Sequence, residues 1–341
     1  MNSSTSSSEG IAPMSAVRWA GFARAFLATA LLLAASLLGL AFLLDPYDTG
    51  HSPLALKPGV RPQGPRMAAA SRGRDPAFQA VIIGNSHIQL VSPEELKART
   101  GIAFLSLATP GTGPKEALAL LEWFLRKRLE PARAIVVGID EHWCTPDPAL
   151  PNKRPFPFWL FSRNLGDYLL GLARYDVIQE LPFRIAYLRN PDSARARPDG
   201  YWNYEAHFDA QGPEAERDRR VTLGTSLQIG GRNHSGPFPA ARALEALALA
   251  AAPEAALILL RPPSYATSHP EPGSQNAAAD SACRAAFAEI TQRHPRSVLI
   301  DWRIGRPENG DPDRFFDHTH YRRSLAVLVE ADIAAVLAPP P

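Results

Sequence analysis

The sequence predicts an α/β protein built on a five-stranded parallel sheet, with one membrane-spanning helix ahead of it. Two observations carry this prediction. Short apolar runs alternate with helical segments along most of the chain, which is typical of parallel sheets with right-handed crossovers. In addition, a long run near the N-terminus has no charged side chain and is long enough to cross a bilayer.

The composition of the 341 residues is that of a globular protein, with 45% apolar and 21% charged residues, which excludes a wholly disordered or collagen-like chain. The 36 basic and 34 acidic residues give a net charge of +2, so nucleic acid is not expected as a partner. The sequence has no Walker A, G-x-G-x-x-G or H-E-x-x-H motif, and nucleotide, dinucleotide and zinc-protease chemistry have no support. We expect no cofactor and no metal.

Residues 25–44 form the apolar run, 20 residues between Arg24 and Asp45. At about 1.5 Å per residue, a helix of this length spans ~30 Å, the thickness of a bilayer's hydrocarbon core. Because Arg18 and Arg24 precede the run, the positive-inside rule leaves residues 1–24 as a cytoplasmic tail. A cleaved signal peptide is the alternative, but its apolar region would usually be ~7–15 residues and end at small side chains. We predict a single-pass anchor in the cell inner membrane, with the C-terminal domain in the periplasm.

Two later segments hold many of the 33 prolines. Residues 45–76 contain six prolines and four glycines, and we expect a semi-extended tether above the membrane. Residues 77–341 then form one domain. It is interrupted at about 145–252 by a segment rich in proline, arginine and aromatic residues. We expect this large insertion to be mostly irregular, with some helix near residues 165–172.

The expected strands are buried apolar runs at residues 79–84, 103–108, 134–138, 256–260 and 297–301. Expected helices cover residues 114–129, 240–251, 277–292 and 321–337. Another helix starts after Ser92, which can act as its N-cap, with proline at the first position and glutamate as capping-box partner. Since ligands of such sheets bind beyond the carboxyl ends of the strands, the residues after each strand are the site candidates.

The turn Gly84-Asn85-Ser86-His87 follows the first strand. A serine at such a turn exposes its hydroxyl at the sheet edge, where the backbone N–H groups of the following turn also point. Ser86 could equally cap the helix that it precedes. His87 could line the pocket, but we expect it to fix the turn.

Asp317 and His320 stand three residues apart, just before the last expected helix. With this spacing a carboxylate can accept from one imidazole nitrogen while the other nitrogen faces a nucleophile, as in a catalytic triad. The structural alternative is that Asp317 is an N-cap and His320 only begins the helix. Because the two ends of the chain offer complementary chemistry, we predict a triad of Ser86, His320 and Asp317.

A serine in a glycine turn after the first strand, with D-x-x-H before the C-terminal helix, resembles the SGNH/GDSL hydrolase superfamily. The sequence is most similar to the membrane-anchored proteobacterial branch, whose serine block reads G-x-S. Asp45-Pro46-Tyr47, after the apolar run, also resembles that branch. The resemblance covers residues 77–143 and 253–337, while the insertion has no counterpart.

This resemblance implies a flavodoxin-like three-layer sandwich, with Ser86 as nucleophile, His320 as general base and Asp317 as the residue that orients it. It also implies an oxyanion hole made of the Ser86 N–H, a glycine N–H from the second block and an asparagine side chain from the third. Gly111 is the candidate glycine, in Ser106-Leu-Ala-Thr-Pro-Gly111.

The third block departs from the family, because Asp140 stands where asparagine is expected. An ionised carboxylate there would repel an oxyanion, and loss of one donor typically costs about 10²–10³ in rate. Asp140-x-His142 also resembles the D-x-H pair of alginate O-acetyltransferase relatives. A rival triad of Ser86, His142 and Asp140 therefore stays open. We favour His320 because its spacing and position both match the triad roles.

Two further features allow alternatives. Tyr201-Trp202-Asn203-Tyr204 and Arg232-Asn233-His234 could form a lid that stacks on carbohydrate, although aromatic side chains more often pack into a core. Cys144 and Cys283 could form a disulfide outside the cytoplasm, or they could be two buried thiols.

The expected function is that of a membrane-anchored serine esterase or O-acyltransferase, acting on acyl esters of glycans or lipids outside the cytoplasm. The alternative is a non-catalytic glycan-binding or assembly subunit that keeps the SGNH fold, which Asp140 and the aromatic insertion would suit. A third hypothesis is a structural membrane protein in which Ser86 only caps a helix.

Overall fold

The computed structural model describes residues 14–147, 155–209, 212–227 and 235–338. Five parallel strands form one sheet in the order β2-β1-β3-β4-β5. In chain order they are β1 (Ala80–Ile83), β2 (Phe104–Ser106), β3 (Ala134–Gly138), β4 (Ala256–Arg261) and β5 (Ser297–Asp301). This confirms the predicted α/β class and the five-stranded parallel sheet. The strands β1, β3 and β4 are buried along their whole length, as expected for a sheet covered on both faces.

The helices around the sheet lie close to their predicted positions. They are α3 (Pro93–Thr100), α4 (Pro114–Arg126), α9 (Pro239–Ala251), α10 (Gln275–Arg293) and α11 (Arg323–Leu337). Ser92 caps α3 as predicted, since its hydroxyl accepts from the Glu95 N–H at 3.3 Å. The predicted capping box would also join the Ser92 N–H to the side chain of Glu95. In the structure the Ser92 N–H instead donates to the Glu330 carboxylate at 2.6 Å. This bond ties α3 to α11.

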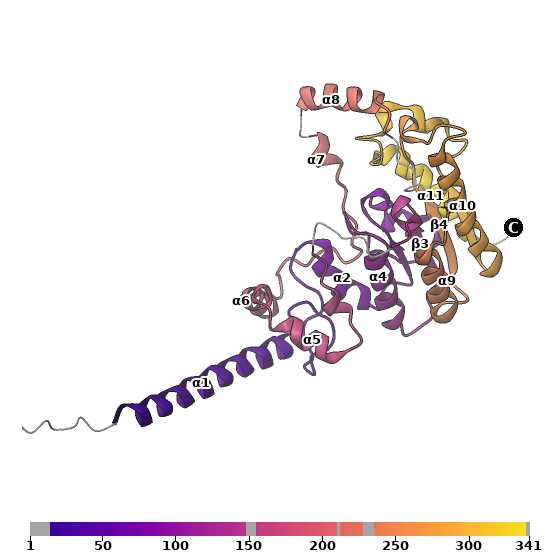
Figure 1. Ribbon diagram of the computed structural model, residues 1–341. Coiled ribbons are helices and arrows are strands. Elements are labelled where there is room, and N and C mark those ends of the chain that lie inside the picture. Colours follow the sequence, from indigo (N-terminus) through magenta and orange to yellow (C-terminus); the bar gives the residue numbers. More distant parts are fainter. Residues whose placement is uncertain (1–13, 148–154, 210–211, 228–234, 339–341) are drawn as a thin grey trace, which may run out of the picture.

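Two apolar clusters pack on opposite faces of the sheet, because alternate strand residues point to opposite sides. One cluster joins Val81 and Val137 to α4, α9 and α10, and the other joins Ile82 and Val136 to α3 and α11. Helices therefore cover both faces of the sheet, and its carboxyl edge remains the place where a site can form (Figure 1).

The N-terminal helix α1 (Met14–Leu44) projects from the domain (Figure 1). Within it, residues Trp19–Leu44 are long and apolar enough to cross a membrane, with a mean hydropathy of 2.5 and 6% of the window buried. The helix begins earlier than predicted, so that residues 14–24 of the expected cytoplasmic tail are helical. The preceding residues of that tail lie outside the described part of the chain.

The segment 45–76 is not the semi-extended tether that we predicted. It contains α2 (Pro65–Arg74), which packs against α4, and Trp123 Nε1 donates to the Ala70 carbonyl at 3.0 Å. Asp45 and Asp48 are buried, and together they accept hydrogen bonds from three backbone N–H groups of the segment. The prolines and glycines here shape turns within a packed structure.

The segment between β3 and β4 is more regular than predicted. Its described part contains α5 (Leu165–Leu172), as expected, and also α6 (Tyr175–Arg189), α7 (Glu205–Asp209) and α8 (Gly212–Gly224) ahead of α9. Cys144 and Cys283 form a disulfide with their Cα atoms 5.5 Å apart, which joins the end of β3 to α10. Of the two alternatives for these cysteines, the structure has the disulfide.

Candidate active site

The turn after β1 is built around a glycine that no other residue could replace without strain. Gly84 has φ +148°, and a Cβ atom there would lie 2.9 Å from Ile88 Cγ2. The chain then enters a single 3₁₀ turn, η1 (Ser86–Ile88), whose cap is Asn85: its side chain accepts from the His87 N–H at 3.0 Å. The cap of this turn is therefore not Ser86, whose hydroxyl stands at the carboxyl edge of the sheet.

The structure brings Ser86, His320 and Asp317 together as the sequence predicts. Ser86 Oγ lies 2.9 Å from His320 Nε2, and His320 Nδ1 lies 2.8 Å from Asp317 Oδ2. These contacts run from a hydroxyl through an imidazole to a carboxylate, the arrangement of a nucleophile, its base and the group that orients the base.

The loop of residues 317–320 holds the Asp317 carboxylate in place. Asp317 Oδ1 accepts from the N–H groups of Thr319 and His320, both at 2.8 Å, and from the Thr319 hydroxyl at 3.1 Å. Burial alone would raise the pKa of Asp317, but the His320 ring and these N–H groups hold that pKa well below its ordinary range. Asp317 is therefore an anion at neutral pH and can stabilise an imidazolium at His320.

Three aromatic rings surround the His320 ring, and two of them come from the segment between β3 and β4. The centroids of His87, Tyr204 and Phe208 lie 5.4, 5.8 and 6.4 Å from that of His320. Tyr204 is buried and donates its hydroxyl to the Tyr321 carbonyl at 3.0 Å. Tyr204 thus packs against the His320 ring inside the protein. It is not exposed to stack on a ligand, contrary to the lid hypothesis.

The lid hypothesis also named Trp202 and the segment Arg232-Asn233-His234. Trp202 is 52% exposed and is open to solvent, whereas Arg232-Asn233-His234 lies outside the described residues. The position of Phe208 beside His320 could not be predicted from the sequence, because a single aromatic residue in a proline-rich segment forms no motif.

Asp140 follows β3 and contacts the turn of residues 84–87, which carries Ser86. Its Oδ2 accepts from the Asn85 side-chain amide and lies 3.3 Å from His87 Nδ1. Its Oδ1 accepts from the His142 N–H at 3.0 Å and lies 3.3 Å from His142 Nδ1. Burial alone would raise the pKa of Asp140, but its contacts with His142 and His87 hold the pKa well below its usual range. Asp140 is therefore a buried anion in contact with Asn85 and His87, the two neighbours of Ser86 in the sequence.

His142 does not take part in a second triad. The hydrogen bond from the Ser86 side chain goes to His320, and within the described part of the chain no bond joins Ser86 to His142. The rival triad of Ser86, His142 and Asp140 is not assembled.

Gly111 lies on the loop after β2, and this loop contacts the turn that carries Ser86. The Thr109 N–H donates to the Gly84 carbonyl at 2.9 Å, and Gly111, two residues further on, has φ +65°. Among the described residues, neither the Ser86 nor the Gly111 N–H has an acceptor.

One group of side chains in the described part of the chain could hold a metal ion. The ligand atoms of His87, Asp140 and Glu141 lie within 4.8 Å of one another. Both oxygens of Asp140, however, already accept hydrogen bonds from Asn85 and from the His142 N–H.

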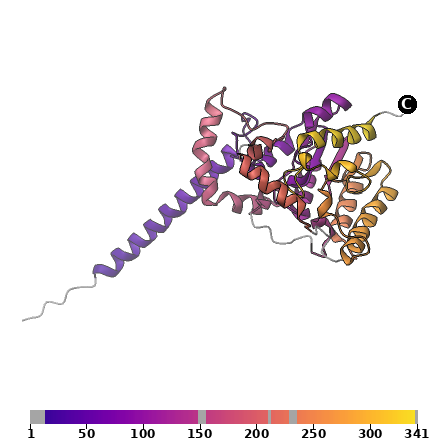
Figure 2. The same cartoon turned by 90° about the horizontal axis from the view of Figure 1, so that it is seen from above.

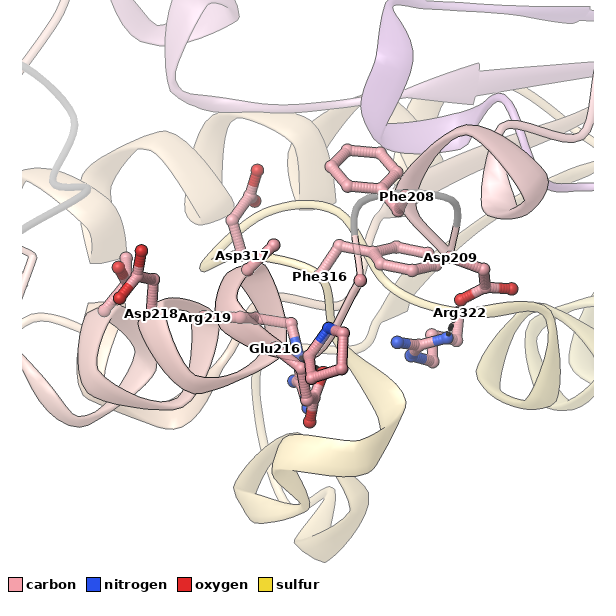
Figure 3. Close-up of a pocket in the computed structure, with 12 residues that line it drawn as sticks. Phe208, Asp209, Glu216, Asp218, Arg219, Phe316, Asp317 and Arg322 are labelled. Carbon is pink, nitrogen blue, oxygen red and sulfur yellow. Dashed lines mark hydrogen bonds and ion pairs between the residues drawn. The ribbon is translucent and has the colours of Figure 1, made fainter.

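A cavity of about 670 Å³ lies beside Asp317, between α7, α8 and the loop before α11, and its volume is that of a small-molecule site. Figure 3 shows Phe208 beside Phe316 and Asp209 next to Arg322. The two phenyl rings stack at 4.3 Å, and Arg322 pairs with Asp209 at 2.9 Å. The cavity combines aromatic faces with charged hydrogen-bonding groups.

The chain matches no model of a known protein family and no curated protein. The functional conclusion therefore depends on the geometry of the site and on the sequence motifs.

Proposed function

We propose that the protein is a membrane-anchored serine esterase or O-acyltransferase that acts on acyl esters of extracytoplasmic glycans or lipids. The observation that carries this proposal is the hydrogen-bonded chain from Ser86 through His320 to Asp317 at the carboxyl edge of the sheet. The Asp317 anion and the N–H groups of Ser86 and Gly111 support it.

In the proposed reaction, Ser86 Oγ attacks the acyl carbonyl carbon while His320 Nε2 takes the hydroxyl proton. The N–H groups of Ser86 and Gly111 stabilise the oxyanion, and Asp317 stabilises the imidazolium. The ester oxygen leaves with the proton from His320, and an acyl-enzyme remains on Ser86. Water or a sugar hydroxyl then attacks that ester, with His320 again taking and returning a proton, so that Ser86 is regenerated.

The strand order supports the family resemblance on which part of this proposal depends. The order 2-1-3-4-5 is that of flavodoxin-like sheets, and helices on both faces make three layers. This is the architecture that the resemblance to SGNH hydrolases implies.

The packing of α1 supports an uncleaved anchor over a cleaved signal sequence. A signal sequence near the N-terminus can meet the same criteria of length and composition, although its apolar region is usually only ~7–15 residues long. Ala41, however, is 1% exposed and belongs to the same apolar cluster as Val81 of the sheet. Cleavage after the apolar run would remove part of the domain's own core.

The proposed chemistry can be tested by labelling the full chain with a fluorophosphonate and by measuring hydrolysis of a chromogenic acetyl ester. The test variant is Ser86→Ala. The matched control is Ser264→Ala, since Ser264 also contacts an imidazole, with its Oγ 3.1 Å from His269 Nε2. We expect labelling and turnover of the wild type and the control, and neither in Ser86→Ala. If Ser86→Ala is labelled as strongly as the wild type, the proposal is wrong.

A non-catalytic glycan-binding or assembly subunit is the second candidate. The buried anion Asp140, which contacts Asn85 and His87 next to Ser86, favours it, because such a charge opposes a developing oxyanion. This candidate predicts no ester turnover by the wild type, together with polysaccharide binding that Ser86→Ala leaves unchanged.

A further inference from the structure

The last turns of α1 are held rigidly by the domain. Leu38, Phe42 and Leu44 pack against the apolar cluster that contains Ala41. Arg184 of α6 donates from Nε to the Leu44 carbonyl at 3.0 Å, and thus occupies one of the carbonyl groups that a helix end leaves without a partner.

The helices α5 and α6 lie beside these last turns. Both contact α1, and α6, seen end-on in Figure 1, crosses α1 as the pink helix of Figure 2. At about 1.5 Å per residue, the predicted span 25–44 fills the ~30 Å hydrocarbon core up to Leu44. Residues 38–44 form the last ~9 Å of that span, so a helix packed on them lies within ~9 Å of the boundary between acyl chains and headgroups.

The surface of α5, α6 and the loop after α1 carries large apolar side chains that the domain does not cover. Leu170 and Tyr175 are 76% and 73% exposed, and Leu54, Leu165 and Phe183 are each at least half exposed. Leu54 is held next to the end of α1, since Ser52 donates to the Leu43 carbonyl at 2.6 Å and accepts from the Leu54 N–H. An apolar patch continuous with a membrane-spanning helix is expected to meet lipid.

A shallow cavity and two arginine residues extend this surface. The cavity, about 620 Å³, is lined by Phe158, Trp159 and Leu170 among others. The side chains of Arg163 and Arg174 are 74% and 55% exposed in this region, where they pair with the carboxylates of Glu122 and Asp176. Guanidinium groups beside apolar side chains suit phosphate headgroups above acyl chains.

We propose that Leu54, α5 and α6 form a membrane-contact surface that lies in the headgroup layer of the phospholipid bilayer that α1 spans. Lipid covers the exposed apolar side chains, and the arginine residues contact lipid phosphates. The domain is then seated on the bilayer in a fixed orientation instead of swinging on a linker. This inference depends on the proposed membrane anchor, but not on the proposed ester chemistry.

The test uses the full chain with a single added thiol, because its two cysteines are joined in the disulfide. Leu170→Cys and Phe183→Cys place the thiol on the membrane-contact surface. Val221→Cys is the matched control, since Val221 is 68% exposed on α8, which Figure 1 shows away from α1. Each variant is labelled with a fluorophore that responds to polarity and is reconstituted into phosphatidylcholine–phosphatidylglycerol vesicles that contain doxyl-labelled lipid.

We expect doxyl lipid to quench the labels at positions 170 and 183 several-fold more than the label at 221. Melting curves close to that of the wild type would show that the variants are folded. Equal quenching at all three positions, in a chain that floats with the vesicles, would overturn the membrane-contact surface. A chain that does not float would overturn the membrane anchor, and the inference with it. Neither result affects labelling of Ser86 by a fluorophosphonate in detergent, so the proposed chemistry is tested separately.

Discussion

The substitution Asp317→Asn tests the proposed mechanism most directly, because the structure shows how it would act without disturbing the loop. Oδ1 receives the N–H groups of Thr319 and His320 and the Thr319 hydroxyl. An asparagine keeps its oxygen there, since a nitrogen would face three donors. Its NH₂ group then takes the place of Oδ2, which is the oxygen nearer to His320 Nδ1, at 2.8 Å against 3.0 Å for Oδ1.

An NH₂ group at that position donates to His320 Nδ1 and forces the imidazole proton onto Nε2. Nε2 then faces Ser86 as a donor and cannot take the hydroxyl proton. A wrong tautomer of this kind costs about 10⁴ in kcat in a well-studied triad, and we expect a loss of about 10³–10⁴. At ~1.36 kcal/mol for each factor of ten, this equals about 4–5.5 kcal/mol of transition-state stabilisation.

The assay is hydrolysis of a chromogenic acetyl ester by the full chain in detergent, with kcat and KM determined separately. Asp311→Asn is the matched control, because Asp311 caps a neighbouring turn through the Asp313 N–H at 2.9 Å and lies outside the triad. We expect the control to keep the wild-type kcat. If Asp317→Asn keeps kcat within a factor of ten of the wild type, Asp317 does not orient the base and the reasoning is refuted.

Three further outcomes follow from the packing and the electrostatics. Gly84→Ala should lower the free energy of unfolding by about 1–3 kcal/mol. The control is Gly101→Ala, because Gly101 also has a positive φ of +69° but a Cβ there would meet open space. In denaturant titrations the control should lose less stability than Gly84→Ala. Because folding lowers the pKa of Asp140, its ionised form stabilises the protein above about pH 4, and this contribution is lost as the pH falls toward the folded-state pKa. The Tm of the wild type should then fall more steeply on acidification below about pH 4 than that of Asp140→Asn, and parallel curves would count against the assignment. Replacing Cys144 and Cys283 by serine should cost about 2–5 kcal/mol in unfolding free energy, and a loss under ~1 kcal/mol would show that the disulfide contributes little.

The sheet could be predicted because its signals are local. Each strand is a short apolar run, and the two that match in both bounds, β3 and β5, each follow an arginine and end at Gly138 and Asp301. The segment 45–76 could not be predicted in this way. Its packing depends on Asp48, which accepts from the distant Gly59 N–H and Ser71 hydroxyl, and composition does not distinguish such a packed segment from a linker.

The site shows the same division. Ser86, Asp317 and His320 are found by asking which polar residues flank the strand ends and the last helix. The role of Asn85 could not be found, because it depends on Asp140, which is 55 residues away in the sequence. The family resemblance places Asp140 where the asparagine of the oxyanion hole is expected. Its carboxylate instead accepts from the Asn85 amide, and which neighbour it contacts depends on the side-chain packing between two strands.

The position of the site relative to α1 bears on the choice between glycan and lipid esters. The loop that carries Asp317 and His320 leads into α11, and Phe208 of α7 packs near His320. Figure 1 shows α7 and α11 on the side of the domain away from α1, whereas α5 lies at the α1 end. A domain seated on the bilayer through α5 and α6 would therefore present its triad to the space beyond the membrane. An ester within the bilayer would have to leave it to reach Ser86, while an acylated polymer outside the membrane meets no such barrier. We therefore expect glycan esters as substrates, and a vesicle-bound acyl lipid cleaved as fast as a soluble acetylated oligosaccharide would contradict this orientation.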